Sequence, residues 1–268
     1  MKLSKRLQMN VSLVPQGARV ADIGCDHGYA AIWLIQNQVA EKMVAMDINE
    51  GPIARAKEHI RREGLEKQIE CRRSNGMEKL EPGEEDTLMI AGMGGPLMID
   101  ILKARPEVLE KVQTLVLQPQ SEIGFVREKL AEFGFELVQE KACRDEGKFY
   151  FAMLAKRSEK AGEPHGCNVS GTGYSTYLIE KQDPVMLEFL LQEKKVYEYR
   201  CAPFGSGASV YTFRRTYRKN EMSGKEMSTM ENISVKIDGK KVVCEKGITY
   251  FELAKQTGHS DALPAAPM

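Results

Sequence analysis

Asp22-Ile-Gly-Cys-Asp-His-Gly28 is the segment of this chain that most clearly indicates its fold. It begins at the end of the short apolar run Ala18–Ile23 and leads into Tyr29–Gln38, where apolar residues recur at helical spacing. A strand, a glycine turn and a helix in that order form the first unit of an α/β fold with parallel strands. Because such folds bind ligands at the carboxyl ends of their strands, we expect this loop to contact a ligand.

The same alternation of strands and helices continues to about residue 156. The expected elements after the first unit are strands at 43–48, 69–73, 87–91, 114–118, 135–141 and 149–156 and helices at 52–63 and 122–133. Only the short turn Arg144-Asp-Glu-Gly147 joins the last two strands, so they must be antiparallel neighbours. A parallel sheet that ends in an antiparallel hairpin is the Rossmann-like sheet of methyltransferases, whereas a dinucleotide dehydrogenase is expected to keep a parallel sixth strand.

The acids of the first loop indicate the kind of ligand. Gly24 and Gly28 do not form a GxGxxG motif, and Asp22 and Asp26 would repel a pyrophosphate. They suit a ligand with a positive amino group, such as the methionine part of S-adenosylmethionine. An ordinary strand-to-helix turn is the alternative. The cofactor candidates in this loop are Asp22, Gly24, Cys25, Asp26 and Gly28.

Three further strand ends carry cofactor candidates. Asp47 ends the second strand, 23 residues after Gly24, where an acid accepts hydrogen bonds from ribose hydroxyls. Asn75 follows the third strand and suits the adenine amino group, and Ala91-Gly-Met-Gly-Gly95 follows the fourth, where the transferred methyl group is expected. The alternatives are a solvated acid, a plain Asn-Gly turn and a loop that opens a helix. The candidates here are Asp47, Ile48, Asn75, Gly76, Gly92, Met93 and Gly94.

Polar residues that surround the first loop are candidates for contacts with the substrate. Asp26, His27 and Tyr29 cluster in sequence, and His27 suits either a general base or a side chain that bonds the backbone. Lys5 and Arg6 suit contacts to phosphate, although exposed helix charges usually have no such role.

Composition limits the other function classes. The 268 residues include 38 Lys and Arg and 38 Asp and Glu, which argues against a strongly electrostatic nucleic-acid binder without excluding local basic patches. The 6 Cys form no CxxC pair, so we expect no metal site and a reducing cytoplasm. The sequence has no apolar run that predicts a signal peptide or a membrane span.

The region after the sheet changes character. Residues 157–182 are expected to form a linker, 183–222 a helical hairpin and 231–268 a partial β-grasp-like tail, truncated or fused. Asp183 is a plausible N-cap of the first helix in that hairpin. Within the tail, Asp238-Gly239 predicts a hairpin turn, and 249–256 looks helical.

Five segments within residues 2–156 resemble the bacterial tRNA (adenine(22)-N(1))-methyltransferases. They are Leu3-Ser-Lys-Arg-Leu7, Ala21-Asp-Ile-Gly-Cys-Asp-His-Gly-Tyr29, Asn49-Glu-Gly-Pro52, Ile90-Ala-Gly-Met-Gly-Gly95 and Leu117-Gln-Pro119. Asp183-Pro-Val185 is similar to the start of the C-terminal coiled-coil hairpin of that family. The resemblance implies a class I methyltransferase with a coiled-coil-like helical appendage, S-adenosyl-L-methionine as cofactor and tRNA as partner.

The implied chemistry needs little acid–base help. Adenine N1 is a neutral nucleophile, so methyl transfer depends on alignment, and the base must be exposed or flipped to reach the methyl group. The resemblance implies that Asp26, His27 and Tyr29 position the adenine as the catalytic group. The residues expected to contact substrate or RNA are Lys5, Arg6, Gly95, Gln118 and Pro119.

Other functions stay open at this stage. One is an RNA-binding module that keeps the methyltransferase fold without turnover, and another is a methyltransferase that acts on a different RNA site. A nucleotide-dependent oxidoreductase is opposed by the missing GxGxxG motif and by the terminal hairpin. The sequence leaves the oligomeric state undetermined.

Overall fold

The computed structural model describes residues 3–158, 173–201, 232–237 and 240–245. Contacts between Cα atoms divide the chain into two units, Met1–Met186 and Leu187–Met268. The first unit contains the whole main sheet, and each unit is described by itself below.

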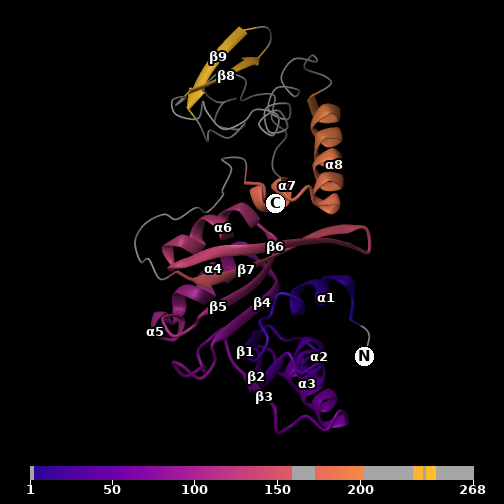
Figure 1. Cartoon of the computed structure of the whole chain (residues 1–268), viewed down its shortest axis with the longest axis vertical. Helices are drawn as coiled ribbons and strands as arrows, with labels where there is room; N and C mark the ends of the chain where they lie inside the picture. Colours follow the sequence, from indigo (N-terminus) through magenta and orange to yellow (C-terminus); the bar gives the residue numbers. More distant parts are fainter. Residues whose placement is uncertain (1–2, 159–172, 202–231, 238–239, 246–268) are drawn as a thin grey trace. The chain divides into compact units, whose positions relative to one another are not determined.

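Seven strands form the main sheet in the order β3-β2-β1-β4-β5-β7-β6 (Figure 1). Strands β1 to β5 pair in parallel, whereas β7 lies antiparallel between β5 and β6. This arrangement confirms the predicted parallel sheet with a terminal antiparallel hairpin. The strands are β1 Ala18–Ile23, β2 Ala40–Asp47, β3 Ile69–Arg73, β4 Thr87–Gly94, β5 Thr114–Ser121, β6 Phe135–Asp145 and β7 Lys148–Arg157.

The terminal hairpin is longer than its sequence suggested, because its turn is tighter. Asp145 pairs with Lys148, so only Glu146 and Gly147 form the turn. Both have a positive φ, +48° and +80°, which is the backbone of a two-residue hairpin turn that matches the twist of the strands. The expected four-residue turn therefore contributes two residues to the strands.

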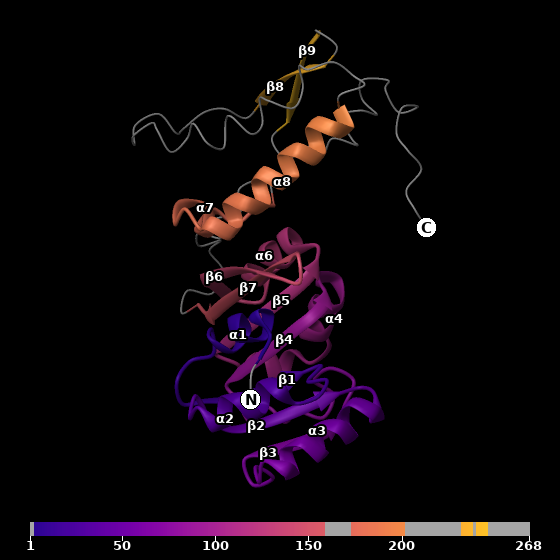
Figure 2. The same ribbon diagram turned by 90° about the vertical axis from the view of Figure 1, so that its right-hand side faces the viewer.

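Helices cover both faces of the sheet (Figures 1 and 2). Residues of α1, α2 and α3 share one apolar core, and residues of α4, α5 and α6 share the other. Neighbouring residues of one strand, such as Val20 and Ala21, belong to opposite cores, as the alternation of a strand requires. The helices are α1 Lys5–Val11, α2 Tyr29–Gln36, α3 Glu50–Arg62, α4 Gly95–Ala104, α5 Pro106–Leu109 and α6 Ile123–Glu132.

Part of the expected linker, residues 157–182, is folded onto the sheet. Helix α7, Thr176–Glu180, lies inside this stretch and contacts β6. Its N-cap Ser175 is fully buried, and the Ser175 hydroxyl donates to a carboxylate oxygen of Glu140. The other Glu140 oxygen accepts from Arg127 Nε at 2.7 Å, and Arg127 Nη1 donates to the carbonyl of Gly173 at 2.6 Å. Residues 173–180 are thus fastened to the core, and 159–172 lie outside the described residues.

The C-terminal elements agree with the expectations where the structure describes them. Helix α8, Pro184–Cys201, begins after Asp183, whose carboxylate accepts from the N–H groups of Val185 and Met186. Strands β8, Asn232–Ile237, and β9, Lys240–Glu245, pair as an antiparallel hairpin. The rest of the expected helical hairpin, the turn 238–239 and the helix 249–256 lie outside the described residues. None of the described helices combines the length and the apolar character needed to cross a membrane.

The buried pair of Arg127 and Glu140 yields a stability prediction. The side chains are 3% and 1% exposed, so Glu140→Ala leaves a buried guanidinium without its partner. We expect this variant to lose about 3–5 kcal/mol in the free energy of unfolding, measured by urea denaturation. Lys129→Ala, which breaks the more exposed pair of Lys129 with Glu132, is the control and is expected to lose less than about 1 kcal/mol. Equal losses in the two variants would contradict the structural role of the buried pair.

Candidate cofactor and active site

The loop after β1 turns sharply at two glycines. Gly24 has a φ of +80° and Gly28 a φ of +72°, a conformation that side chains rarely adopt. The N–H groups of Gly24 and Cys25 both donate to the carbonyl of Met46, at 2.8 and 2.9 Å, so the loop is fixed to the end of β2. A Cβ on Gly28 would lie 3.2 Å from the Cβ of Ala56, which shows how closely α3 packs against this turn.

Asp22 is a buried acid at the end of β1. It is 4% exposed, and among the described residues no donor forms a hydrogen bond with its carboxylate. Burial and the nearby carboxylate of Asp47 raise the pKa of Asp22 to about 7. A buried carboxylate without a donor is unfavourable unless a donor or cation joins it, so this position suits a cationic ligand group.

The end of β2 lies beside that of β1, and the end of β3 follows next along the same edge. The N–H of Asn49 donates to Asp47 Oδ1 at 2.9 Å, and the N–H of Ser74 donates to the carbonyl of Asp47 at 2.9 Å. Ile48 is 54% exposed, an unusual position for a large apolar side chain directly after a buried strand. Asn75 is exposed, and its amide donates to Glu78 at 2.8 Å. Here the structure places an acid and an apolar surface together, with a side-chain amide in the next loop.

The end of β4 touches the loop after β1, and β4 continues to Gly94, so Gly92-Met-Gly94 belongs to this strand and does not follow it as we expected. A Cβ on Gly24 would lie 2.3 Å from the Cε of Met93, so the end of that flexible side chain would have to move to accommodate it. Gly92 has a φ of +80°, and its Cβ position is 3.2 Å from Nη1 of Arg6. Gly95 is enclosed more tightly, since a Cβ there would lie 2.7 Å from the carbonyl oxygen of Ser121.

The N-terminal helix completes this edge of the sheet. Arg6 Nη1 donates to Gln118 Oε1 at 3.1 Å, and the backbone N–H of Arg6 donates to Asp145 at 3.0 Å. The guanidinium carbon lies 5.8 Å from the ring centre of Tyr150. Gln118 is fully buried, and its Nε2 donates to the carbonyl of Pro119 at 3.1 Å. The structure thus brings together Arg6, Gln118 and Gly92, which the sequence offered only as separate candidates.

The His27 ring lies in a stack of three rings. The ring centres of His27 and Tyr29 are 5.3 Å apart, and His59 on α3 lies 5.9 Å from His27 and 5.0 Å from Tyr29. Asp26, 68% exposed, is 3.4 Å from His27 Nε2, and His27 Nδ1 has no partner among the described residues. The alternative of a His27 ring bonded to the backbone is therefore not seen there. The rings of His27 and Tyr29 therefore contact α3, and they do not contact Arg6 or Gln118.

Lys5 lies outside this arrangement, and the described residues form no metal site. Lys5 does not join Arg6 at the strand ends but lines a separate cavity with α7. The described residues include no group of three or more His, Cys, Asp or Glu side chains that could hold a metal ion.

Comparisons with known proteins place this site in a family. Residues 3–153 match the family model described as "Methyltransferase domain". The tRNA (adenine(22)-N(1))-methyltransferase of Bacillus subtilis is 34% identical over 194 residues, which are 72% of this chain and 82% of that protein. The chain belongs to this methyltransferase family. 

Solved structures agree with the placement in this methyltransferase family. The B. subtilis m1A22 tRNA methyltransferase TrmK is 30% identical, with a TM-score of 0.65 over 81% of this chain and 94% of that one. Streptococcus pneumoniae Sp1610 in complex with S-adenosyl-L-methionine is also 30% identical, with a TM-score of 0.67 over 74% of this chain and 91% of that one.

Sequence reasoning missed several residues that contact this candidate site. His59, Tyr150 and Asp145 each contact a predicted site residue, and none of them lies within a motif. Asp145 is 139 residues from Arg6 in the chain, so no local pattern signals their contact. The apolar Ile48 was a candidate only through its place beside Asp47.

The contact of Gly24 with Met93 gives a test with a matched control. Gly24→Ala places a methyl group against Met93 and strains a left-handed residue, whereas Gly17→Ala strains a similar residue, φ +77°, with nothing within 4 Å. We expect each to lose about 1 kcal/mol of stability from the backbone. Only Gly24→Ala is expected to weaken S-adenosylmethionine binding, at least tenfold by calorimetry. Equal cofactor affinity in the two variants would show that the loop contact has no role in binding.

Proposed function

We propose that this chain transfers a methyl group from S-adenosyl-L-methionine to N1 of the adenine at position 22 of tRNA. The observation that carries the proposal is the buried carboxylate of Asp22, to which no described residue donates, beside the glycine loop on the edge where Arg6 and Gln118 meet. The relatives named above support the choice of adenine and tRNA.

The residues at this edge fit the cofactor from its amino group to its adenine. Asp22 would hold the amino group, and Asp47, with one carboxylate oxygen bonded to Asn49, would accept from the ribose hydroxyls. Ile48 offers the apolar surface on which an adenine ring packs, and Asn75 offers an amide beside it. The positive φ angles of the glycines at 24, 28, 76 and 92 let the backbone turn where the strands end. When bound, S-adenosylmethionine supplies an electrophilic methyl group.

The chain's own task at the substrate end is alignment. N1 of adenine has a lone pair, so no strong base is needed, and the rate depends on holding the base at the right distance and angle. Gln118 holds the guanidinium of Arg6 beside Gly92. The remaining N–H groups of Arg6 can donate there to a phosphate or a base edge of the substrate. Gly95 and Pro119 line the same slot. We assign Met93, between this slot and Gly24, to the apolar wall near the methyl group.

Asp26, His27 and Tyr29 are our candidates for positioning the flipped adenine. The exposed carboxylate of Asp26 can accept from the N6 amino group, and the rings of His27 and Tyr29 offer a stacking surface. His59 supports that surface from α3, with its Nδ1 3.0 Å from the carbonyl oxygen of His27. In the division of the chain that we favour, the catalytic domain spans residues 1–156, the helical region helps to hold tRNA, and the reaction takes place in the cytoplasm.

The direct test is methyl transfer to an unmodified tRNA transcript. N1-methyladenine blocks reverse transcription, so we expect a primer-extension stop at position 22 that disappears when the adenine is replaced by guanine. Asp26→Ala is expected to lower kcat/KM at least tenfold with little change in cofactor affinity. Unchanged turnover of Asp26→Ala would remove this residue from the catalytic group. Tight tRNA binding without any stop would favour the RNA-binding module over the enzyme.

The raised pKa of Asp22 predicts how cofactor affinity depends on pH. A bound ammonium group favours the ionised form, so binding lowers the pKa of Asp22 from about 7 and releases a proton. Affinity is then expected to rise with pH between 5 and 7, by up to about tenfold per pH unit, and to level off above 7. Calorimetry in buffers of different ionisation enthalpy measures both the affinity and the released proton.

Two variants separate Asp22 from other groups in that experiment. Asp22→Asn is expected to bind more weakly at pH 8 and to lose the pH dependence. Glu85, another acid whose burial raises its pKa to about 7, lies just before β4 at the opposite end of the strand from Gly92. Glu85→Gln is therefore expected to keep the wild-type profile. A profile that survives in Asp22→Asn would show that another group binds the amino group.

A further inference from the structure

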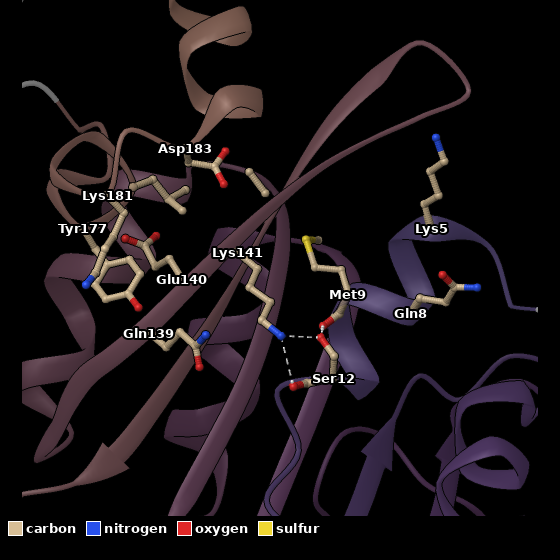
Figure 3. A pocket seen from close by; sticks show the side chains of 12 residues that line it. Lys5, Gln8, Met9, Ser12, Gln139, Glu140, Lys141, Tyr177, Lys181 and Asp183 are labelled. Carbon is tan, nitrogen blue, oxygen red and sulfur yellow. Dashed lines mark hydrogen bonds between the residues drawn. The ribbon is translucent and has the colours of Figure 1, made fainter. Parts of the chain in front are cut away.

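A cavity of about 540 Å³ lies apart from the strand ends, between α1 and α7 (Figure 3). Its floor is β6 around residues 139–142, and all of its walls belong to the first unit of the chain. Lysines from three separate elements line it, together with polar side chains. They are Lys5 of α1, Lys141 of β6 and Lys181 after α7, with Gln8, Ser12, Gln139 and Tyr177 beside them.

The three lysines are not neutralised by acids of the fold. Lys141 Nζ donates to the hydroxyl of Ser12 at 2.7 Å and to its carbonyl at 3.3 Å, both uncharged acceptors. Within the part of the chain that the structure describes, Lys5, Lys141 and Lys181 form no ion pair. Burial lowers the pKa of Lys141, so an anion beside its ammonium group would offset an unfavourable environment.

The acids that line the cavity are already engaged. Glu140 is 2% exposed and is bound by Arg127 and by Ser175. Asp183 accepts from the N–H groups of Val185 and Met186 at the start of α8. Arg127 neutralises Glu140, whereas Asp183 keeps its charge, so the three lysines face one unpaired carboxylate and leave the lining net positive. The same contacts of Glu140 fasten the α7 wall to β6, so the cavity is preformed.

We propose that this cavity binds backbone phosphates of the tRNA substrate next to the catalytic edge. Figure 3 shows Lys5, Lys141 and Lys181 spread along the cavity instead of converging on one point. A compact anion would need convergent charges, whereas an extended polyanion places successive phosphates along such a row. The amides and hydroxyls between the lysines are the neutral groups that commonly contact phosphate and sugar.

Helix α1 connects the cavity to the methyl-transfer edge. Lys5 lines the cavity, and the next residue, Arg6, reaches Gln118 and Gly92. An RNA strand held in the cavity would therefore continue toward the slot in which we place the adenine. The inference rests on the proposed function, since it assumes that the substrate is tRNA.

Two substitutions on the floor and wall test the cavity. Lys141→Gln keeps a donor toward Ser12, and Lys181→Ala shortens an exposed side chain, so neither is expected to unfold the protein. The control is Lys67→Ala, an exposed lysine before β3 at the opposite edge of the sheet from β6. Fluorescence anisotropy with labelled tRNA, at several KCl concentrations, gives Kd and its salt dependence for each variant.

We expect the double variant Lys141→Gln/Lys181→Ala to bind tRNA about tenfold more weakly near 0.15 M salt. The slope of log K against log salt is expected to fall by about 1 to 2, because two phosphate contacts are lost. The KM for tRNA is expected to rise, while kcat at saturating tRNA and the affinity for S-adenosylmethionine stay at the wild-type values. Lys67→Ala is expected to match the wild type in every measurement.

The outcomes separate this inference from the proposed function. A salt slope and Kd of the double variant equal to those of Lys67→Ala would overturn the phosphate site. A fall in kcat with an unchanged KM for tRNA would also overturn it. So would binding of inorganic phosphate in the cavity that leaves the Kd for tRNA unchanged. If the wild type binds tRNA with the expected slope but transfers no methyl group, the cavity stands and the proposed function fails.

Discussion

Two carboxylates at the ends of neighbouring parallel strands determine which ligand the rest of this site can bind. Asp22 on β1 lies close enough to Asp47 on β2 for the charge of Asp47 to raise the pKa of Asp22, and Asp22 is buried. The parallel pairing of the two strands leaves both acids at the same edge of the sheet. Their repulsion and the burial oppose folding at neutral pH, so a bound cation would stabilise the protein by more than its direct contacts.

The glycines around these acids follow from the same constraint. A cation can reach Asp22 only if the loops that cross the strand ends carry no side chain in its path. The contact of Gly24 with Met93 shows how closely the first loop meets the end of β4, since an added carbon on Gly24 would displace the Met93 methyl group. Gly95, at the start of α4, packs against the backbone of Ser121, which leaves no room for an added carbon. The backbone thus forms the walls of the site, and few side chains remain to recognise the ligand.

The sequence predicted the features that depend on local pattern. The apolar runs predicted each strand of the main sheet, and the acids of the first loop predicted the ligand class, because strand period and loop chemistry are encoded within a few residues. The sequence did not predict the contact of Arg6 with Gln118 or the buried pair of Arg127 and Glu140. The members of the first pair are 112 residues apart in the chain, and their contact exists only once α1 packs against the sheet. Helix α7 was missed for a related reason. It has only five residues, and its packing against β6 depends on the hydrogen bond from Ser175 to the distant Glu140.

The antiparallel hairpin links the fold to both proposed sites. Because β7 is inserted between β5 and β6, strand β6 becomes the edge of the sheet and offers its outer side to other elements. Helices α1 and α7 both contact this strand, and the cavity lies between them. Asp145 at the end of β6 fixes Arg6 for the catalytic edge, whereas Lys141 on the same strand faces the cavity. The feature that distinguishes this sheet from that of a dehydrogenase therefore also builds the surface on which we place the RNA backbone.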